Sequence, residues 1–195
     1  ASDLYLSGKM NSLIKECLNK ADIIRGIYEE LYKKKLPKDW YPFQVFCPNC
    51  GKQSTTRVFN WDGKKVAFVC EVDKVKWTKG CGLKDEISPF SSKEGIVGKL
   101  PWKVEWPCKW KAIGVTVEGA GKDHMSRGGS HDLASLVCKR VLNYPIPYPV
   151  GYEFFLVGGK KMSSSKGLGS SSSEMLEILP PSLLRFIMVK TKINQ

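Results

Sequence analysis

The sequence predicts a mixed α/β protein with a small cysteine-bearing insertion and helices on either side of it. Apolar residues recur at helical spacing near the start, four cysteines bracket two strand-like runs, and two later strand-like runs lead into glycine-rich loops. With 195 residues and 42% hydrophobic content, the chain can bury the core of one domain with a small appendage. We expect a helical segment over residues 1–42, the insertion over 43–88, an α/β region over 89–173 and helices over 174–195.

The charge balance favours a polyanionic partner. Lys and Arg total 31 against 19 Asp and Glu, a formal net charge of +12. Nucleic acid is the leading candidate, although such an excess also suits simple solubility. No window approaches the ~20 apolar residues of a membrane-spanning helix, and the first residues lack the pattern of a signal peptide. We therefore expect a soluble, cytoplasmic protein with no membrane partner.

The stretch 10–35 predicts an amphipathic helix, because its apolar residues recur every three or four positions. The lysines at 33–35 suit a final turn, and Pro37 stops the helix. A break near Ala21–Asp22 would divide it into two helices. Cys17 lies on the apolar face, so we interpret it as a core residue.

Four cysteines between residues 43 and 88 indicate a zinc ribbon. Cys47 and Cys50 enclose two residues and precede a glycine, a knuckle in which two thiolates can hold one ion. Cys70 and Cys81 form a less regular second half, and two short strands joined by a turn lie between the halves. In a reducing compartment seven cysteines suggest a metal, the alternative being reduced core cysteines. Four thiolates leave no position open for water, so the expected Zn²⁺ is structural.

Tryptophan recurs every four residues at Trp102, Trp106 and Trp110, a spacing that fits one face of a helix. Pro101 and Pro107, however, predict that no continuous helix runs through this stretch. Core packing is the expected role of Trp106 and Trp110. Trp102 follows a proline and precedes a lysine, which makes it a candidate wall of a substrate pocket.

Residues 112–118 predict a buried strand that leads through a glycine-rich loop into a helix over 131–142, with Ser130 as N-cap. A strand, a glycine-rich loop and a helix N-terminus form half of a nucleotide-binding βαβ unit. An acidic residue in this loop, Asp123, can bond ribose hydroxyls. From the residues alone, a loop or capping role suits His124, and the predicted helix places its other histidine, at 131, on the surface.

A loop rich in lysine and serine follows the strand-like run 152–157. Its residues 158–167 read Gly-Gly-Lys-Lys-Met-Ser-Ser-Ser-Lys-Gly. Ammonium groups can neutralise phosphate oxygens, hydroxyl and backbone N–H groups can bond to them, and glycine permits close approach, a combination that suits a triphosphate. By composition alone, a solvated surface loop is the plainer interpretation.

Two motifs carry a resemblance to a known family. The order Lys-Met-Ser-Ser-Ser-Lys-Gly resembles the KMSKS signature of class I aminoacyl-tRNA synthetases, with Ser164 where the usual pattern has lysine and Lys166 two residues later. The string Leu-Pro-Trp-Lys-Val-Glu-Trp, residues 100–106, resembles the class I lysyl-tRNA synthetases of archaea and some bacteria. The family's Gly-x-Asp sequence matches Gly121 and Asp123.

The resemblance implies the second half of a Rossmann-like catalytic fold in residues 89–173, with a zinc ribbon of four cysteine ligands inserted before it. It also implies site residues. Those expected to act on the ATP phosphates are Lys161, Lys166, Ser163, Ser164 and Ser165; those expected to hold the ATP ribose are Gly121 and Asp123; those expected to contact the lysine substrate are Trp102, His124 and Tyr152.

The implied function is that of a lysine–tRNA ligase, with L-lysine, ATP with Mg²⁺ and tRNA(Lys) as partners. The resemblance covers the chain, yet the family's His-x-Gly-His signature is absent from it, and residues 174–195 would lead toward an anticodon-binding part. We therefore expect a central fragment with little or no aminoacylation activity by itself. Two alternatives stay open: a zinc-ribbon RNA-binding module without catalysis, and a class I synthetase for another amino acid. The acid that would pair with the lysine ammonium is Glu118, Asp123 or a residue outside this chain.

Overall fold

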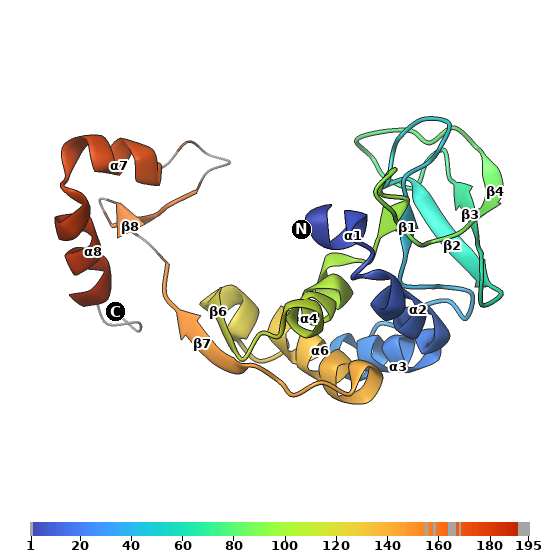
Figure 1. Cartoon of the computed structure of the whole chain (residues 1–195), viewed down its shortest axis with the longest axis horizontal. Coiled ribbons are helices and arrows are strands. Elements are labelled where there is room, and N and C mark those ends of the chain that lie inside the picture. Colours follow the sequence, from blue (N-terminus) through green and yellow to red (C-terminus); the bar gives the residue numbers. More distant parts are fainter. Residues whose placement is uncertain (1, 155, 158, 164–166, 168, 191–195) are drawn as a thin grey trace. The chain divides into compact units, whose positions relative to one another are not determined.

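The chain forms two compact units of mixed α/β structure. The computed structural model describes residues 2–154, 156–157, 159–163, 167 and 169–190 (Figure 1). The first unit comprises residues 1–116 and 127–148, and the second comprises residues 117–126 and 149–195. Within the described ranges, no helix has both the length and the apolar character that crossing a membrane requires.

Most of the described helices of the chain lie in the first unit. They are α1 (Ser2–Leu6), α2 (Asn11–Asn19), α3 (Ala21–Tyr32), α4 (Trp102–Ile113), α6 (Ser130–Val137) and the π-helical turn η1 (Cys138–Leu142). Lys20 alone separates α2 from α3, which confirms the predicted break. Lys33 takes a left-handed conformation with φ of 52° and ends α3, four residues before Pro37.

The apolar faces of these helices meet in one core. Leu13 and Ile24 are buried as the helical spacing predicts. Cys17 is also a core residue, as predicted, and its Sγ lies 3.5 Å from the Sγ of Cys108 on α4. Each large apolar side chain buried in this way stabilises the fold by about 1.5–3 kcal/mol. The same core includes side chains of the neighbouring sheet, such as Phe68, so helices and sheet are packed as one body.

A buried polar contact ties α1 to α4. The Tyr5 hydroxyl donates to Glu105 Oε1 at 2.8 Å and accepts from the Leu100 N–H at 3.3 Å. Lys109 donates to the other oxygen of Glu105 at 2.8 Å. A carboxylate that is only 8% exposed requires such partners, because an unpaired buried charge is costly. The beginning of α4 is therefore fixed by hydrogen bonds as well as by packing.

The structure corrects two predictions around α4. The helix runs through Pro107 without interruption, and Pro101 precedes its first residue instead of breaking it. Burial of Val104, Cys108 and Trp110 on this helix outweighs the cost of the N–H that proline lacks. The predicted strand over 112–118 is also wrong at its start, because α4 continues to Ile113 and the next strand begins only at Val117.

The surface position predicted for His131 is wrong as well. Its side chain is 9% exposed and packs between α6 and α4, with ring centroids 6.2 Å from Trp106 and 5.7 Å from Trp110. Trp110 is fully buried, which confirms its predicted core role. The aromatic face of α4 therefore covers the start of α6.

Two small sheets lie beside the helices. β2 (Thr56–Trp61), β3 (Val66–Cys70) and β4 (Lys84–Ile87) form an antiparallel sheet, and β1 (Gln44–Val45) pairs with β5 (Gly98–Lys99). The strands β2 and β3 confirm the two runs predicted between the cysteine pairs. A Cβ on Gly98 would lie 2.3 Å from the Gln44 carbonyl oxygen, so only glycine fits where β5 meets β1.

The second unit is built from short elements. β6 (Val117–Gly121) pairs with β7 (Tyr148–Tyr152), and α5 (Lys122–Met125) follows β6 directly. β8 (Leu156–Val157) and β9 (Lys160–Lys161) form a tight antiparallel hairpin. Two helices complete the unit, α7 (Ser172–Ile178) and α8 (Pro181–Lys190). The cap of α7 is Ser171, which exchanges hydrogen bonds with Glu174 in a capping box.

Candidate functional site

The four cysteines predicted as metal ligands come together at one end of the β2–β3–β4 sheet. Cys47 and Cys50 lie just after β1, Cys70 is the last residue of β3, and Cys81 precedes β4. Their sulfur atoms all lie within 4.8 Å of one another, with Sγ–Sγ distances of 3.5 Å for Cys47–Cys81 and 3.7 Å for Cys50–Cys70. Gly51 has a φ of 69°, so glycine suits the turn that closes the first knuckle.

The cluster fits a tetrahedral metal ion. Zn–S bonds of about 2.3 Å in a tetrahedron require sulfur atoms about 3.8 Å apart, close to the separations in this cluster. Additional groups surround the sulfurs: Thr55 Oγ1 lies 3.2 Å from Cys70 Sγ, and the Cys81 N–H donates to the same sulfur at 3.4 Å. Four thiolates in this geometry suit Zn²⁺ or iron, and they leave no coordination position for a substrate.

The protein perturbs two of these thiols in opposite directions. Burial raises the pKa of Cys47 to about 12. A backbone hydrogen bond from Leu83, with a further one from the Asn49 side chain, lowers the pKa of Cys81 to about 6. Cys47 and Cys81 therefore differ in how readily they give up the proton that metal binding displaces.

A second candidate site lies within the second unit, where two predicted motifs meet. Lys161, on β9, donates to Asp123 Oδ2, on α5, at 3.1 Å, although 38 residues separate them. Both side chains are about half exposed, at 52% and 60%. The Lys161 ammonium also lies 3.3 Å from the centroid of the Phe154 ring. The strand–loop–helix motif and the lysine-rich loop therefore contact each other through the two residues that sequence analysis assigned to ATP.

Lys122 extends this charged cluster. Its ammonium pairs with Glu153 Oε2 at 2.5 Å and lies 5.0 Å from the centroid of the Phe154 ring. Phe154 thus has a lysine against its ring from each of two elements. Sequence analysis missed this residue, because an aromatic in a strand-like run is more often a core residue.

Three further predicted residues, Gly121, His124 and Tyr152, also belong to the second unit. Gly121 ends β6, His124 is exposed on α5, and Tyr152 ends β7 with a 43% exposed side chain. A Cβ added at Gly119 or Gly121 would lie 3.9 Å from the Tyr152 ring, an ordinary contact. The tyrosine ring therefore does not by itself require glycine at these two positions.

Part of the lysine- and serine-rich loop is not described. Ser163 is half-buried, and Gly167 takes a left-handed conformation with φ of 62°. The predicted phosphate-binding residues Lys166, Ser164 and Ser165 lie outside the described residues.

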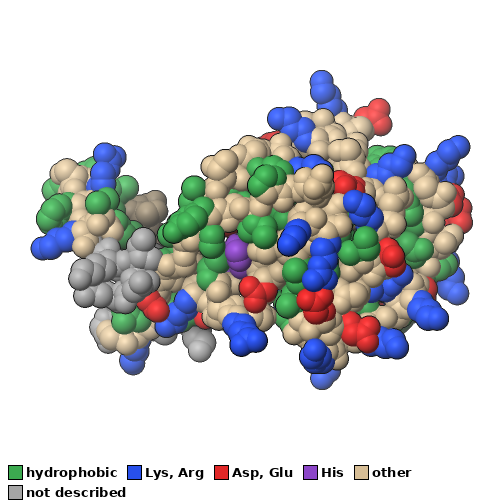
Figure 2. Space-filling view, turned by 90° about the horizontal axis from the view of Figure 1, so that it is seen from below, with side chains coloured by type: hydrophobic (Ala, Val, Ile, Leu, Met, Phe, Trp, Pro, Cys, Tyr) green, Lys and Arg blue, Asp and Glu red, His purple; other side chains and the backbone are tan. Residues whose placement is uncertain are grey.

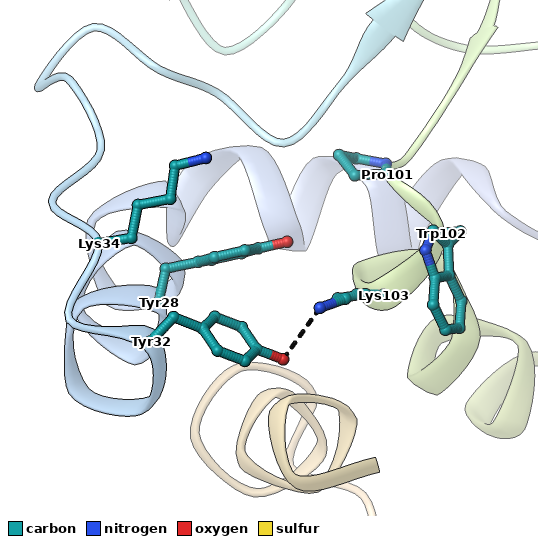
Figure 3. A pocket seen from close by; sticks show the side chains of 6 residues that line it. All are labelled: Tyr28, Tyr32, Lys34, Pro101, Trp102 and Lys103. Carbon is teal, nitrogen blue, oxygen red and sulfur yellow. Dashed lines mark hydrogen bonds between the residues drawn. The ribbon is translucent and has the colours of Figure 1, made fainter. Parts of the chain in front are cut away.

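Trp102 lies in the first unit, where it lines a cleft of about 360 Å³ (Figure 3). Its side chain is 51% exposed. The cleft is lined by Tyr28, Tyr32, Lys34, Pro101, Trp102 and Lys103. Lys103 Nζ donates to the Tyr32 hydroxyl at 3.1 Å and lies 4.4 Å from the centroid of that ring, a contact drawn in Figure 3.

The chemistry of this cleft is aromatic and positive. Burial, together with the neighbouring Tyr32 hydroxyl, raises the pKa of Tyr28 to about 12, so this phenol stays protonated at neutral pH. The six described lining residues include two lysines and no carboxylate. The cleft can hold an aliphatic stem or a carboxylate, whereas a substrate ammonium would need an acid from elsewhere. Sequence analysis identified Trp102 and missed the two tyrosines, which lie in the stretch predicted only as an amphipathic helix.

Comparisons with known proteins agree with the resemblance of the motifs. A family model described as tRNA synthetases class I (K) matches residues 1–195. The chain is 40% identical over 193 residues to a lysine–tRNA ligase of Methanosarcina barkeri (strain Fusaro), and this alignment covers 98% of this chain and 34% of that protein. It is 36% identical over 190 residues to the lysine–tRNA ligase of Thermoplasma acidophilum, covering 97% of this chain and 35% of that protein. The chain thus spans about a third of the length of the curated relatives that it matches.

Proposed function

Since this chain belongs to the class I tRNA synthetases (K), we propose that it supplies part of the catalytic region of a lysine–tRNA ligase. In the proposed reaction, a lysine carboxylate oxygen attacks the α-phosphorus of ATP, and the bond to the bridging oxygen of the β-phosphate breaks. Pyrophosphate leaves, and lysyl-adenylate forms. A ribose hydroxyl of the terminal nucleotide of tRNA(Lys) then attacks the lysyl carbonyl carbon, and AMP leaves.

The observation that carries the proposal is the contact between Lys161 and Asp123 at 3.1 Å. It brings a lysine of the KMSKS-like loop next to the acid of the Gly-x-Asp sequence. When ATP binds, this half-exposed ion pair would open, and the two groups would hold the ribose and the phosphates of one ATP molecule. In the proposed site, the carboxylate accepts hydrogen bonds from the ribose, and the ammonium neutralises charge on the β- and γ-phosphates. With Gly121 at the end of β6, this half of the ATP site belongs to the second half of a Rossmann-like fold.

Each remaining assigned residue has a stated role in this proposal. Ser163, Ser164, Ser165 and Lys166 add donors to the phosphates, and Mg²⁺ accompanies the ATP phosphates. In the first unit, Trp102 would pack against the aliphatic stem of a lysine substrate. In the second unit, His124 and Tyr152 are assigned to lysine binding by the family resemblance alone. The four thiolates of Cys47, Cys50, Cys70 and Cys81 hold Zn²⁺, which makes residues 43–88 a zinc ribbon. The ion cross-links the chain there and takes no part in the reaction.

The proposal is tested by separating adenylate formation from RNA binding. In the protein that contains this chain, Lys161→Ala should lower lysine-dependent ATP–pyrophosphate exchange by about 10²–10³-fold, the range for removing one group that stabilises transition-state charge. Affinity for tRNA, measured by filter binding, should change by less than about twofold. The control is Lys160→Ala, which removes the same charge one residue earlier on β9. Equal losses of exchange for both variants, or losses of tRNA affinity as large as those of exchange, would contradict the assignment.

A further inference from the structure

A tryptophan lies open to solvent at the tip of the loop that joins the third and fourth cysteines. We call residues 72–80 the Trp77 loop. Val75 and Thr78 pair in an antiparallel bridge, so Lys76 and Trp77 form the two-residue turn at its end. The Trp77 side chain is 77% exposed. Tryptophan is usually well buried, because its large apolar surface gains most from leaving water, so a tryptophan at a loop tip requires an explanation.

The loop is held in place by hydrogen bonds at its base. The Gly80 N–H donates to the Val72 carbonyl at 3.0 Å, and Lys52 Nζ donates to the Lys79 carbonyl at 2.8 Å. The Lys74 ammonium donates to the carbonyl of Thr56 on β2. The first bond closes the loop, the second ties its returning arm to the segment after Cys50, and the third ties its outgoing arm to the sheet.

At Gly80, where the loop turns back toward the sheet, the backbone leaves no room for a side chain. A Cβ at Gly80 would lie 2.2 Å from the backbone oxygen of Glu71, so glycine alone permits the two arms to close. Trp77 is therefore presented by a defined turn next to the cysteine cluster, and its exposure does not come from a frayed end.

The polar residues of the loop are mostly basic. Residues 72–80 contain three lysines, Lys74, Lys76 and Lys79, and one acid, Asp73. Asp73 pairs with Lys79 at 3.9 Å, but both side chains are about 80% exposed, so water and salt screen this pair. The loop keeps a positive field around the indole. Figure 2 shows basic side chains over much of the visible surface, so the exposed indole, more than the charge, distinguishes this loop.

We propose that the Trp77 loop binds unpaired nucleotides of an RNA. An exposed indole offers a flat face on which a base can stack, and lysines beside it can neutralise the flanking phosphates. A base inside a duplex has both faces covered by its stacked neighbours, so the expected partner is a single-stranded end, loop or bulge. Val72 is the other large apolar side chain exposed in this described loop, too little for a protein–protein contact built on apolar area.

The inference adds an RNA contact outside the proposed ATP site. It rests on the proposed function only in choosing tRNA as the natural RNA. The stacking partner would be an unpaired nucleotide of that tRNA, and the metal-held sheet would set where the loop meets it.

The test measures RNA affinity by fluorescence anisotropy with two probes, a tRNA(Lys) transcript and a single-stranded oligoribonucleotide about twelve nucleotides long, within the usual span of such sites. Trp77→Ala should weaken binding of both by about 5–150-fold, the range for losing one base stack, while Trp77→Phe should keep most of the affinity. The metal content of each variant should equal that of the parent protein, which separates loss of contact from loss of folding. Unchanged affinity of Trp77→Ala within twofold overturns the proposal.

The lysines are tested with a matched pair of variants. Lys76→Ala with Lys79→Ala should reduce the slope of log affinity against log salt concentration by about 1.4, since each single-strand phosphate contact contributes about 0.7. Lys64→Ala with Lys65→Ala removes the same charge from the exposed turn after β2, and should change the slope much less. Equal slopes for both pairs would mean that only general surface charge binds the RNA, which also overturns the proposal.

The activation step written above consumes no RNA, so ATP–pyrophosphate exchange measured at saturating tRNA separates this inference from the proposed function. Normal exchange in Trp77→Ala combined with unchanged RNA affinity defeats the inference alone. Absent exchange in the parent protein combined with Trp77-dependent RNA binding defeats the proposed catalysis and leaves the inference in place.

Discussion

Removing the hydroxyl of Tyr5 should destabilise the first unit through the beginning of α4. Tyr5→Phe keeps the fully buried ring, so it opens no cavity comparable to that of an alanine substitution. It deletes the 2.8 Å hydrogen bond to the Glu105 carboxylate and leaves the Leu100 N–H without its acceptor at 3.3 Å. The helix affected is the one that carries Trp102.

The expected loss is about 2 kcal/mol. A hydrogen bond to a charged group contributes roughly 1.5–3 kcal/mol, and the longer bond from Leu100 adds only a fraction of a neutral one. Lys109 still pairs with Glu105 at 2.8 Å, so the carboxylate is not left as an isolated buried charge, which would cost about 3–5 kcal/mol. For a chain of this size, 2 kcal/mol corresponds to a fall in melting temperature of about 4–8 °C.

Urea unfolding at pH 7 measures this free energy, with Tyr148→Phe as the control, since Tyr148 is 71% exposed and should stay within about 0.5 kcal/mol of the parent. A Tyr5→Phe variant that also stays within 0.5 kcal/mol would refute the reasoning. The pH dependence is a second check. Burial, and next the Glu105 charge, raises the pKa of Tyr5 well above its usual range, so its contribution is complete below the unfolded pKa of about 10. At pH 11 the free energy of unfolding of the parent should fall by about 1.4 kcal/mol, whereas the Phe variant has no such loss. The difference in stability between the two proteins should therefore be smaller at pH 11 than at pH 7.

Four further outcomes are expected. Gly98→Ala should destabilise the protein by about 3 kcal/mol in urea unfolding, because its Cβ meets the β1 backbone at 2.3 Å, whereas Gly95→Ala, with open space around it, should be nearly neutral. Gly26→Ala fills open space in α3 and should raise stability by about 0.5–1 kcal/mol; a decrease would contradict the helix assignment. Cys70→Ser should abolish stoichiometric zinc in elemental analysis and lower the melting temperature, and retention of one zinc per chain would argue against four-thiolate binding. Zinc release to a chromophoric chelator should increase as the pH falls from about 8 to about 5, because protons compete with the metal for the thiolates; release that is independent of pH over this range would contradict thiolate ligation.

Periodicity and spacing predicted much of the first unit. The structure confirms the helical face over 11–32, the break beside Ala21 and the two strands between the cysteine pairs, all of which follow from local patterns. The lysines at 33–35, predicted as the final turn, lie beyond the end of the helix. The meeting of the four cysteines was also predictable, because thiolates at knuckle spacing have few other uses in a reducing compartment.

The predictions that failed depended on tertiary packing. Pro107 lowers local helix propensity, yet the buried residues around it keep α4 continuous through residue 113. His131 is polar and lies at the start of a helix, but two tryptophans from α4 cover it. The cleft beside Trp102 combines side chains from α3 and α4, about 70 residues apart, which no local pattern brings together.

The seven cysteines fall into two groups whose reactivity with thiol reagents would report two different events, loss of the metal and unfolding of the core. Cys17, Cys108 and Cys138 are fully buried, and burial raises the pKa of the last two, so they react with thiol reagents only when the helical core opens. The other four cysteines belong to the cluster beside the sheet, where a bound ion would shield them. Labelling followed by mass spectrometry should therefore show that the exposed Cys81 and the half-buried Cys50 become reactive when the metal is lost, whereas the three core thiols become reactive only on unfolding. One labelling experiment can thus measure when the metal is lost and when the helical core opens, separately in the same molecule.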